Sequence, residues 1–158
     1  MSRETLEELE AQEDELQFLS FTNDTAWELG NALVATAREG GLAVTIDVSR
    51  GEQRLFHCAL PGTAADNDEW IERKNRVVRR FGHSSYYMGV KEGEAFAARH
   101  LLDERLFAAH GGAFPLIVRD VGVVGTVTVS GLPQAEDHRL VVAGLRDFLG
   151  LQGASGRG

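Results

Sequence analysis

Cysteine is nearly absent from this chain, since Cys58 is the one cysteine in 158 residues. A single cysteine cannot form an intramolecular disulfide, so we expect a reducing compartment, the cytoplasm. Long apolar runs are also lacking, because no segment approaches the ~20 apolar residues of a transmembrane helix. The opening residues MSRETLEELEAQEDE are polar and acidic, which is not the pattern of a secretory signal. We therefore expect a cytoplasmic protein with no membrane partner.

Basic charge is scarce as well. The chain has 16 Lys+Arg against 24 Asp+Glu, which gives a net charge of −8 and a pI near 5.1. Phosphate backbones select basic surfaces, so we expect no nucleic-acid partner. Proline is rare with 3 residues, whereas the 18 glycines exceed the usual share of about 7%. This composition is that of a folded globular chain and does not define a function.

Apolar periodicity predicts helices that alternate with two pairs of strands. Helical spacing favours five helices. One starts at Thr5, three cover 22–39, 67–81 and 95–110, and the last runs from Pro133 onward. The pattern allows a break in the 95–110 helix near Asp103. Residues 16–21 fit either a helix end or a short strand. Alternation predicts strand pairs at 42–48 with 52–60 and at 114–118 with 123–129.

Consecutive hairpins separated by helices indicate an α+β fold with a mainly antiparallel sheet. We predict a single domain over 5–151 and a flexible tail over 152–158, where there is nothing apolar to bury. In strand 123–130, Val123, Val127 and Val129 are expected on one face, with Val124 and the threonines on the other. Both faces suit packing, so we expect self-association.

Three histidines, His83, His110 and His138, occupy predicted helix ends beside glycine or small polar residues, where ligand sites are commonly built. Glycines next to them permit close approach of a ligand. The helix dipole should keep His138 neutral in the first turn of its helix. Capping histidines and plain turn glycines explain the same pattern without a ligand, and both interpretations stay open. We interpret His57 and His100 as packing or surface residues, and no histidine has metal-ligand spacing, so no metal site is predicted.

Lys74 is unusual because it interrupts the apolar stripe formed by Trp70, Val77 and Phe81. Its stem could follow Trp70 and leave the ammonium in water. Alternatively, Lys74 is a buried counterion for a carboxylate of a ligand or a neighbouring subunit. Four arginines on the same helix add a positive patch to an acidic chain. No nucleophile motif, P-loop or dinucleotide fingerprint is present, so catalytic residues stay unassigned and we lean against an enzyme.

Three stretches carry a family resemblance: WIERK at 70–74 with RFGHSS at 80–85, HGGAFP at 110–115, and GTVTVSGLP at 125–133 with DH at 137–138. Together they resemble the haem-degrading-domain family (GlcG/HbpS-like), specifically its intracellular branch, over about residues 5–150. The resemblance implies about five antiparallel strands flanked by helices, assembly into homo-oligomers, and haem as a candidate cofactor. The sequence contains no Cys-x-x-Cys-His haem-attachment motif.

Two functional hypotheses follow. The first is a protein that binds haem or a related small ligand, and the second is a non-catalytic oligomeric protein-interaction module. Under the first hypothesis, the candidate ligand-binding residues are His83, Ser84, Ser85, His110, Gly111, Gly112, Ser130, Gly131, His138 and Lys74.

Overall fold

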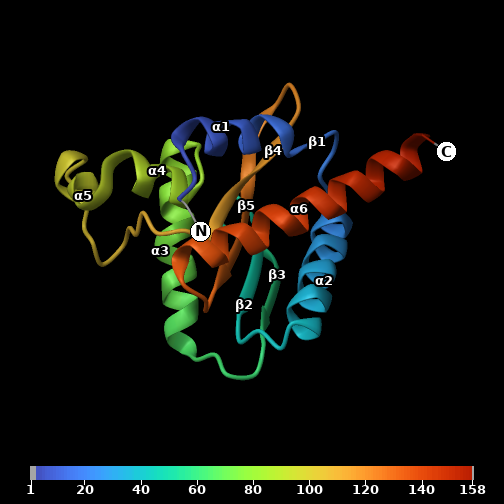
Figure 1. The fold of residues 1–158 in the computed structure, drawn as a ribbon, viewed down its shortest axis with the longest axis horizontal. Helices are drawn as coiled ribbons and strands as arrows, with labels where there is room; N and C mark the ends of the chain where they lie inside the picture. Colours follow the sequence, from blue (N-terminus) through green and yellow to red (C-terminus); the bar gives the residue numbers. More distant parts are fainter. Residues whose placement is uncertain (1–2, 158) are drawn as a thin grey trace.

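A five-stranded sheet in the order β1-β4-β5-β2-β3 forms the centre of the fold, which a computed structural model describes for residues 3–157 (Figure 1). The strands β2 and β3, β2 and β5, and β4 and β5 pair antiparallel, whereas β1 runs parallel to β4. The predicted α+β class and both hairpins are confirmed. The strands are β1 (Gln17–Phe18), β2 (Thr45–Arg50), β3 (Gln53–Ala59), β4 (Ala113–Val118) and β5 (Gly122–Ser130).

The first helices begin where the sequence offers capping side chains. Thr5 and Glu8 form a reciprocal capping box at α1, and Thr22 caps α2. We expected residues 152–158 to form a flexible tail. The last helix extends over residues 152–157, and Gly158 lies outside the described residues. The flexibility of the tail stays a prediction. The helices are α1 (Leu6–Glu15), α2 (Asn23–Glu39), α3 (Ala65–Phe81), α4 (Ser85–Glu92), the 3-10 turn η1 (Gly93–Ala95), α5 (Phe96–Arg99) and α6 (Gln134–Arg157).

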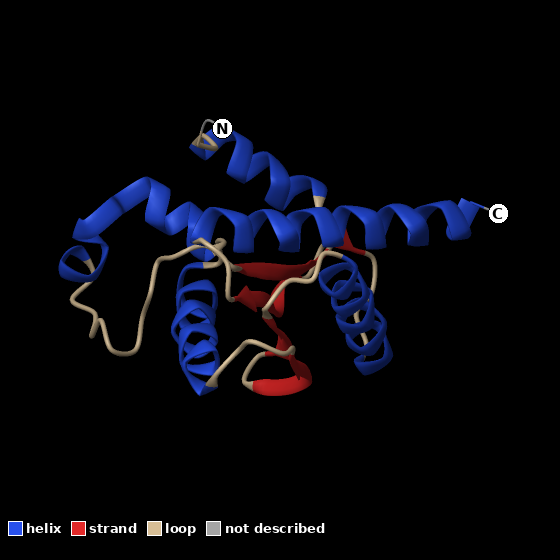
Figure 2. Ribbon diagram, turned by 60° about the horizontal axis from the view of Figure 1, so that its bottom comes forward, coloured by secondary structure: helices blue, strands red, loops and turns tan. Residues whose placement is uncertain are grey.

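Helices cover both faces of the sheet (Figure 2). Alternating apolar residues such as Ile46, Val48, Val127 and Val129 form the main core with α2 and α6. The opposite face is buried against α3 but is polar, and its residues include Thr45, Asp47, Thr126, Thr128 and Ser130. The chain's own helices therefore cover both faces of β5, so the argument for self-association from those faces is wrong.

A β-bulge breaks the expected alternation on β5. The β4–β5 register shifts between Leu116 and Ile117, and one extra β5 residue, Val124, opposes no partner. Val124 consequently packs against the main core, while Val123 is exposed. The expected face of these two valines was therefore wrong, because strict period-two counting cannot include a bulge.

The predicted 95–110 helix is wrong in its second half. The helix ends at Arg99, and Leu101 adopts a left-handed φ of 54°. Residues 100–112 then form a loop, which four hydrogen bonds with α3 hold. Arg73 donates two to the Glu104 carbonyl, Arg76 donates one to the Leu106 carbonyl, and the Arg73 carbonyl accepts one from the Ala108 amide. These arginines therefore order a loop, which accounts for part of the positive patch noted in the sequence.

Helix α4 was not predicted. Ser84 caps it, and Tyr86, Tyr87 and Met88 are buried in a second apolar cluster with Val77. The 100–112 loop crosses α4 at Gly89, where a side chain would collide with the carbonyl of Ala109. With η1 and α5, α4 forms an arm that projects beside α3 (Figure 1).

Candidate functional site

Three neighbouring cavities share one residue, His110, in the loop between α5 and β4. The outer cavity has a volume of about 630 Å³ and is lined by Arg3, Tyr86 and Arg139 among others. The arm cavity, of about 570 Å³, lies between the arm and Arg73. The inner cavity, of about 250 Å³, lies between the first turns of α3 and α6. His110 is therefore placed to contact a ligand in any of the three.

The environment of His110 favours the neutral form of its imidazole, whose pKa is lowered from the ordinary 6.5. Partial burial lowers its pKa, and the positive charges of Lys74 and Arg73 lower it further. The residue is exposed overall, with its ring tilted against Trp70 at a centroid separation of 5.3 Å. Within residues 3–157 neither ring nitrogen has a hydrogen-bond partner. We expected His110 to end a helix, and this is wrong. It lies in the loop that leads into β4.

The inner cavity brings four of the predicted residues together. Lys74, His110, Ser130 and Gly131 all line it, although they come from α3, the loop before β4, the end of β5 and the turn that follows it. Trp70 and Asp137 also line it; both lie in the stretches that carry the family resemblance but were not predicted as site residues. Asn67 and Gln134, two further wall residues, carried no signal in the sequence.

Lys74 is a buried counterion. Its ammonium donates to Asp137 Oδ2 at 3.2 Å and to the Val129 carbonyl at 3.3 Å, and the residue is 3% exposed. The interpretation that its stem follows Trp70 and leaves the head in water is wrong, because Asp137 of α6 and the Val129 carbonyl of β5 hold the ammonium at the wall of the inner cavity. The carboxylate belongs to this chain and not to a ligand or another subunit.

The two glycines of HGG make room for this arrangement. Gly112 has a φ of 139°, and a Cβ there would lie 2.7 Å from Lys74 Nζ. Gly111 donates its amide to Gln134 Oε1 at 2.9 Å, and a Cβ there would collide with the Gln134 carbonyl. Both glycines are therefore required by close approach to α6 or Lys74.

His83, Ser84 and Ser85 do not line the three cavities. His83 Nδ1 lies 2.8 Å from Glu13 Oε1, and the Ser84 amide donates to the same carboxylate. Ser85 exchanges hydrogen bonds with the backbone of Ala113. These residues tie α4 to α1 and β4, which is a structural role.

His138 is buried beneath α1. Its Nε2 lies 2.8 Å from Gln12 Oε1, and its Nδ1 has no partner among the described residues. Burial lowers its pKa to about 4, so the ring is neutral as expected, although the cause is desolvation more than the helix dipole. His138 packs on Tyr86, which also lines the outer cavity.

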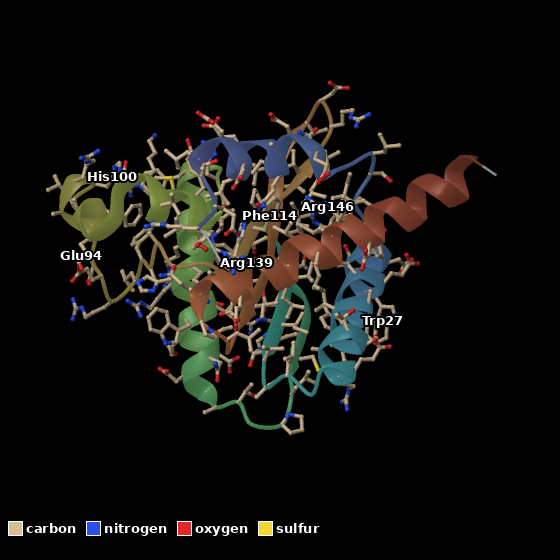
Figure 3. The ribbon with its side chains drawn as sticks, viewed as in Figure 1. Trp27, Glu94, His100, Phe114, Arg139 and Arg146 are labelled. Carbon is tan, nitrogen blue, oxygen red and sulfur yellow. The ribbon has the colours of Figure 1, made fainter. Side chains whose placement is uncertain are left out.

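The outer cavity carries charge of both signs at its rim. Arg139 on α6 forms a bidentate ion pair with Glu4, and Glu94 on η1 lies across from it; Figure 3 labels Arg139 and Glu94. Arg139 was missed because one arginine in an amphipathic helix carries no distinguishing signal.

Within residues 3–157 no three His, Cys, Asp or Glu side chains are grouped as a metal site. None of the helices in that same range has the length and apolarity needed to span a bilayer.

The fold and its cavities define a small α+β domain with one mixed sheet between helical layers, and known proteins share it. Residues 21–146 match the family model described as haem degrading protein HbpS-like. The chain therefore belongs to the HbpS-like haem-degrading protein family.

Its relatives include curated sequences and solved structures. A UPF0303 protein of Streptomyces coelicolor is 56% identical over 149 residues, which covers 92% of this chain and 94% of the relative. A UPF0303 protein of Edwardsiella ictaluri is 48% identical over 153 residues, covering 95% and 98%. The crystal structure of the Ybr137w protein is 36% identical with a TM-score of 0.89, covering 94% of this chain and 89% of that one. The PduOC:Heme complex shares the fold at 19% identity and a TM-score of 0.62, covering 80% and 94%.

Proposed function

We propose that this protein binds haem or a related carboxylated tetrapyrrole in the outer cavity, against His110. The observation that carries the proposal is the His110 imidazole, without a hydrogen-bond partner in the described residues, on the wall of a cavity of about 630 Å³. Ligand pockets usually measure about 300–1,000 Å³ and combine apolar walls with a few polar anchors.

The donor set fits haem. A neutral imidazole is a common ligand of haem iron, and guanidinium groups pair with carboxylates such as propionates. His110 would hold the metal, and Arg3 at the same cavity would pair with a carboxylate, whereas Arg139 is already paired with Glu4. When bound, haem would supply a redox-active iron. Membership of the HbpS-like family and the shared fold of the PduOC:Heme complex support the proposal.

A haemin titration of the purified protein tests this function. We expect a saturable, shifted Soret band for the wild type, and its loss in His110→Ala. His83→Ala is the matched control, since His83 is bound to Glu13 away from the cavities, and it should bind like the wild type. Equal binding by His110→Ala and the wild type would remove His110 from the site.

Self-association in the cytoplasm is the second element of the proposal. Leu101 is 93% exposed and Leu106 is 45% exposed, both beyond the end of α5. Two exposed leucines on a projecting segment favour a protein contact there. This observation also supports the alternative function, a non-catalytic interaction module.

We also propose a cytoplasmic location, on the ground that the chain has a single cysteine and so no internal disulfide.

A further inference from the structure

The choice of lysine at position 74 is itself unusual. The chain has two lysines, Lys74 and Lys91, whereas every other basic side chain apart from histidine is an arginine. Lys91 is exposed on α4, whereas Lys74 is buried. The chain therefore places one of its two lysines, and not one of its many arginines, at a buried position. Arginine is the usual choice for a buried ion pair, whereas a lysine amine can lose its proton and act as a nucleophile.

The structure makes room for that amine at the inner cavity. Gly112 lets Nζ pack directly against the backbone, since a Cβ there would lie 2.7 Å from Nζ, and Lys74 forms part of the cavity wall. Two of the three ammonium donors are used, by Asp137 and by the Val129 carbonyl. One position on the nitrogen therefore remains for a molecule in the cavity.

We propose that the inner cavity binds a small hydroxylated aldehyde or ketone and that Lys74 captures its carbonyl carbon as an imine. This proposal does not depend on tetrapyrrole binding, which uses the outer cavity.

Asp137 is positioned to handle the protons of this step. It accepts a proton from the ammonium, which leaves a neutral amine whose lone pair attacks the carbonyl carbon. The carbonyl electron pair moves to oxygen, and one nitrogen proton passes to that oxygen to give the carbinolamine. Asp137 then returns its proton as the hydroxyl leaves as water. The product is an iminium beside the Asp137 carboxylate, so atoms and charge balance. Burial lowers the pKa of Lys74 and raises that of Asp137, and both shifts favour the first proton transfer.

The remaining walls select the ligand class. The Asp66 carboxylate lies at the cavity, and Lys74 is already neutralised by Asp137, so an anionic ligand would be repelled. Ser130, Asn67 and Gln134 supply hydroxyl and amide groups, which suit ligand hydroxyls. A volume of about 250 Å³ is enough for a ligand of a few carbon atoms. Three- and four-carbon sugars have this chemistry.

Reductive trapping tests the proposal on the full chain. Protein is incubated with glyceraldehyde and sodium cyanoborohydride at neutral pH, and the modified lysine is located by peptide mass mapping. We expect Lys74 to be labelled about tenfold faster than exposed Lys91, because a desolvated lysine is an activated nucleophile. In urea the preference should vanish, since it depends on the cavity. Asp137→Asn should slow labelling of Lys74 and leave Lys91 unchanged.

The two lysines of one molecule provide the internal comparison, so no variant has to fold for the test to decide. Labelling of Lys91 at an equal or greater rate than Lys74 in the folded protein would overturn the proposal. Loss of haemin binding would leave this result unaffected, and the two proposals fail separately.

Discussion

Lys74 and Asp137 form an ion pair whose two members depend on each other unequally. The carboxylate also accepts hydrogen bonds from the amides of Leu132 and Gly131, whereas the ammonium has one carbonyl besides Asp137. Loss of the carboxylate therefore leaves the greater uncompensated charge in the interior.

We predict that Asp137→Ala destabilises the protein by about 3–5 kcal/mol, because it leaves a buried ammonium without its counterion. Lys74→Met should cost clearly less, since Met fills the space and Asp137 keeps its backbone donors. Urea denaturation of both variants measures the difference. Equal costs would show that the surrounding packing, and not the unpaired charge, sets the stability here.

His138 should make stability depend on pH. Its folded pKa of about 4 lies below the ordinary value of 6.5, so between these values the unfolded chain binds more protons. Stability from this group is therefore complete above pH 6.5 and decreases as the pH falls toward 4, by on the order of 3 kcal/mol.

The variant His138→Gln isolates this contribution, because glutamine keeps an amide for Gln12 and does not titrate. The raised pKa values of Glu13 and Asp137 act in the opposite direction and cancel in the comparison. The stability difference between wild type and variant should shrink as the pH falls from 6.5 to 4. A constant difference would contradict a buried neutral imidazole.

At the residue scale the sequence predicted which positions are unusual better than it predicted their partners. Lys74 was identifiable because it interrupts an apolar stripe, but Asp137 lies on another helix and periodicity carries no information about it. His83, His110 and His138 looked alike as histidines beside small residues. Only the packing of α1 separates them, because α1 covers His138 and binds His83, while His110 stays open.

At the scale of elements, the loop from α5 into β4 fixes the site through Gly112. We predict that Gly112→Ala costs at least about 2 kcal/mol, from its left-handed φ and from collision with the Val129 carbonyl and Lys74. Gly41→Ala is the control, since Gly41 has a φ of 61° and open space around its Cβ position. Its cost should be about 1 kcal/mol. Denaturation midpoints compare the two, and similar losses would mean that φ alone matters.

Elements with regular periodicity were predictable, and those shaped by neighbours were not. The helices α2 and α3 and both hairpins follow apolar spacing and capping residues closely. The 100–112 loop has helical composition, yet hydrogen bonds from α3 arginines and the left-handed Leu101 hold it as an irregular loop with short turns. The bulge at Val124 likewise depends on pairing with β4, which no local pattern encodes. For residues 16–21 the sequence left a helix end and a short strand open, and pairing with β4 decides for the strand β1.

For the whole molecule we predict a homo-oligomer. The exposed Leu101 and Leu106 are the surface expected to be covered, and Leu101→Glu should weaken assembly because it places a charge in that contact. Multi-angle light scattering at micromolar concentration gives the mass directly. A wild-type mass equal to the 17.2 kDa chain would contradict the prediction.

The central claim is that a ligand binds against His110, and histidine-ring NMR tests it most directly. Gallium(III) protoporphyrin IX is a diamagnetic haem analogue, and it can be titrated into protein with labelled histidines. We predict that the His110 ring resonances shift in proportion to occupancy, while those of His83 and His57 stay in place because carboxylates hold both rings. Saturable binding that moves the His83 ring and leaves His110 unchanged would contradict the account.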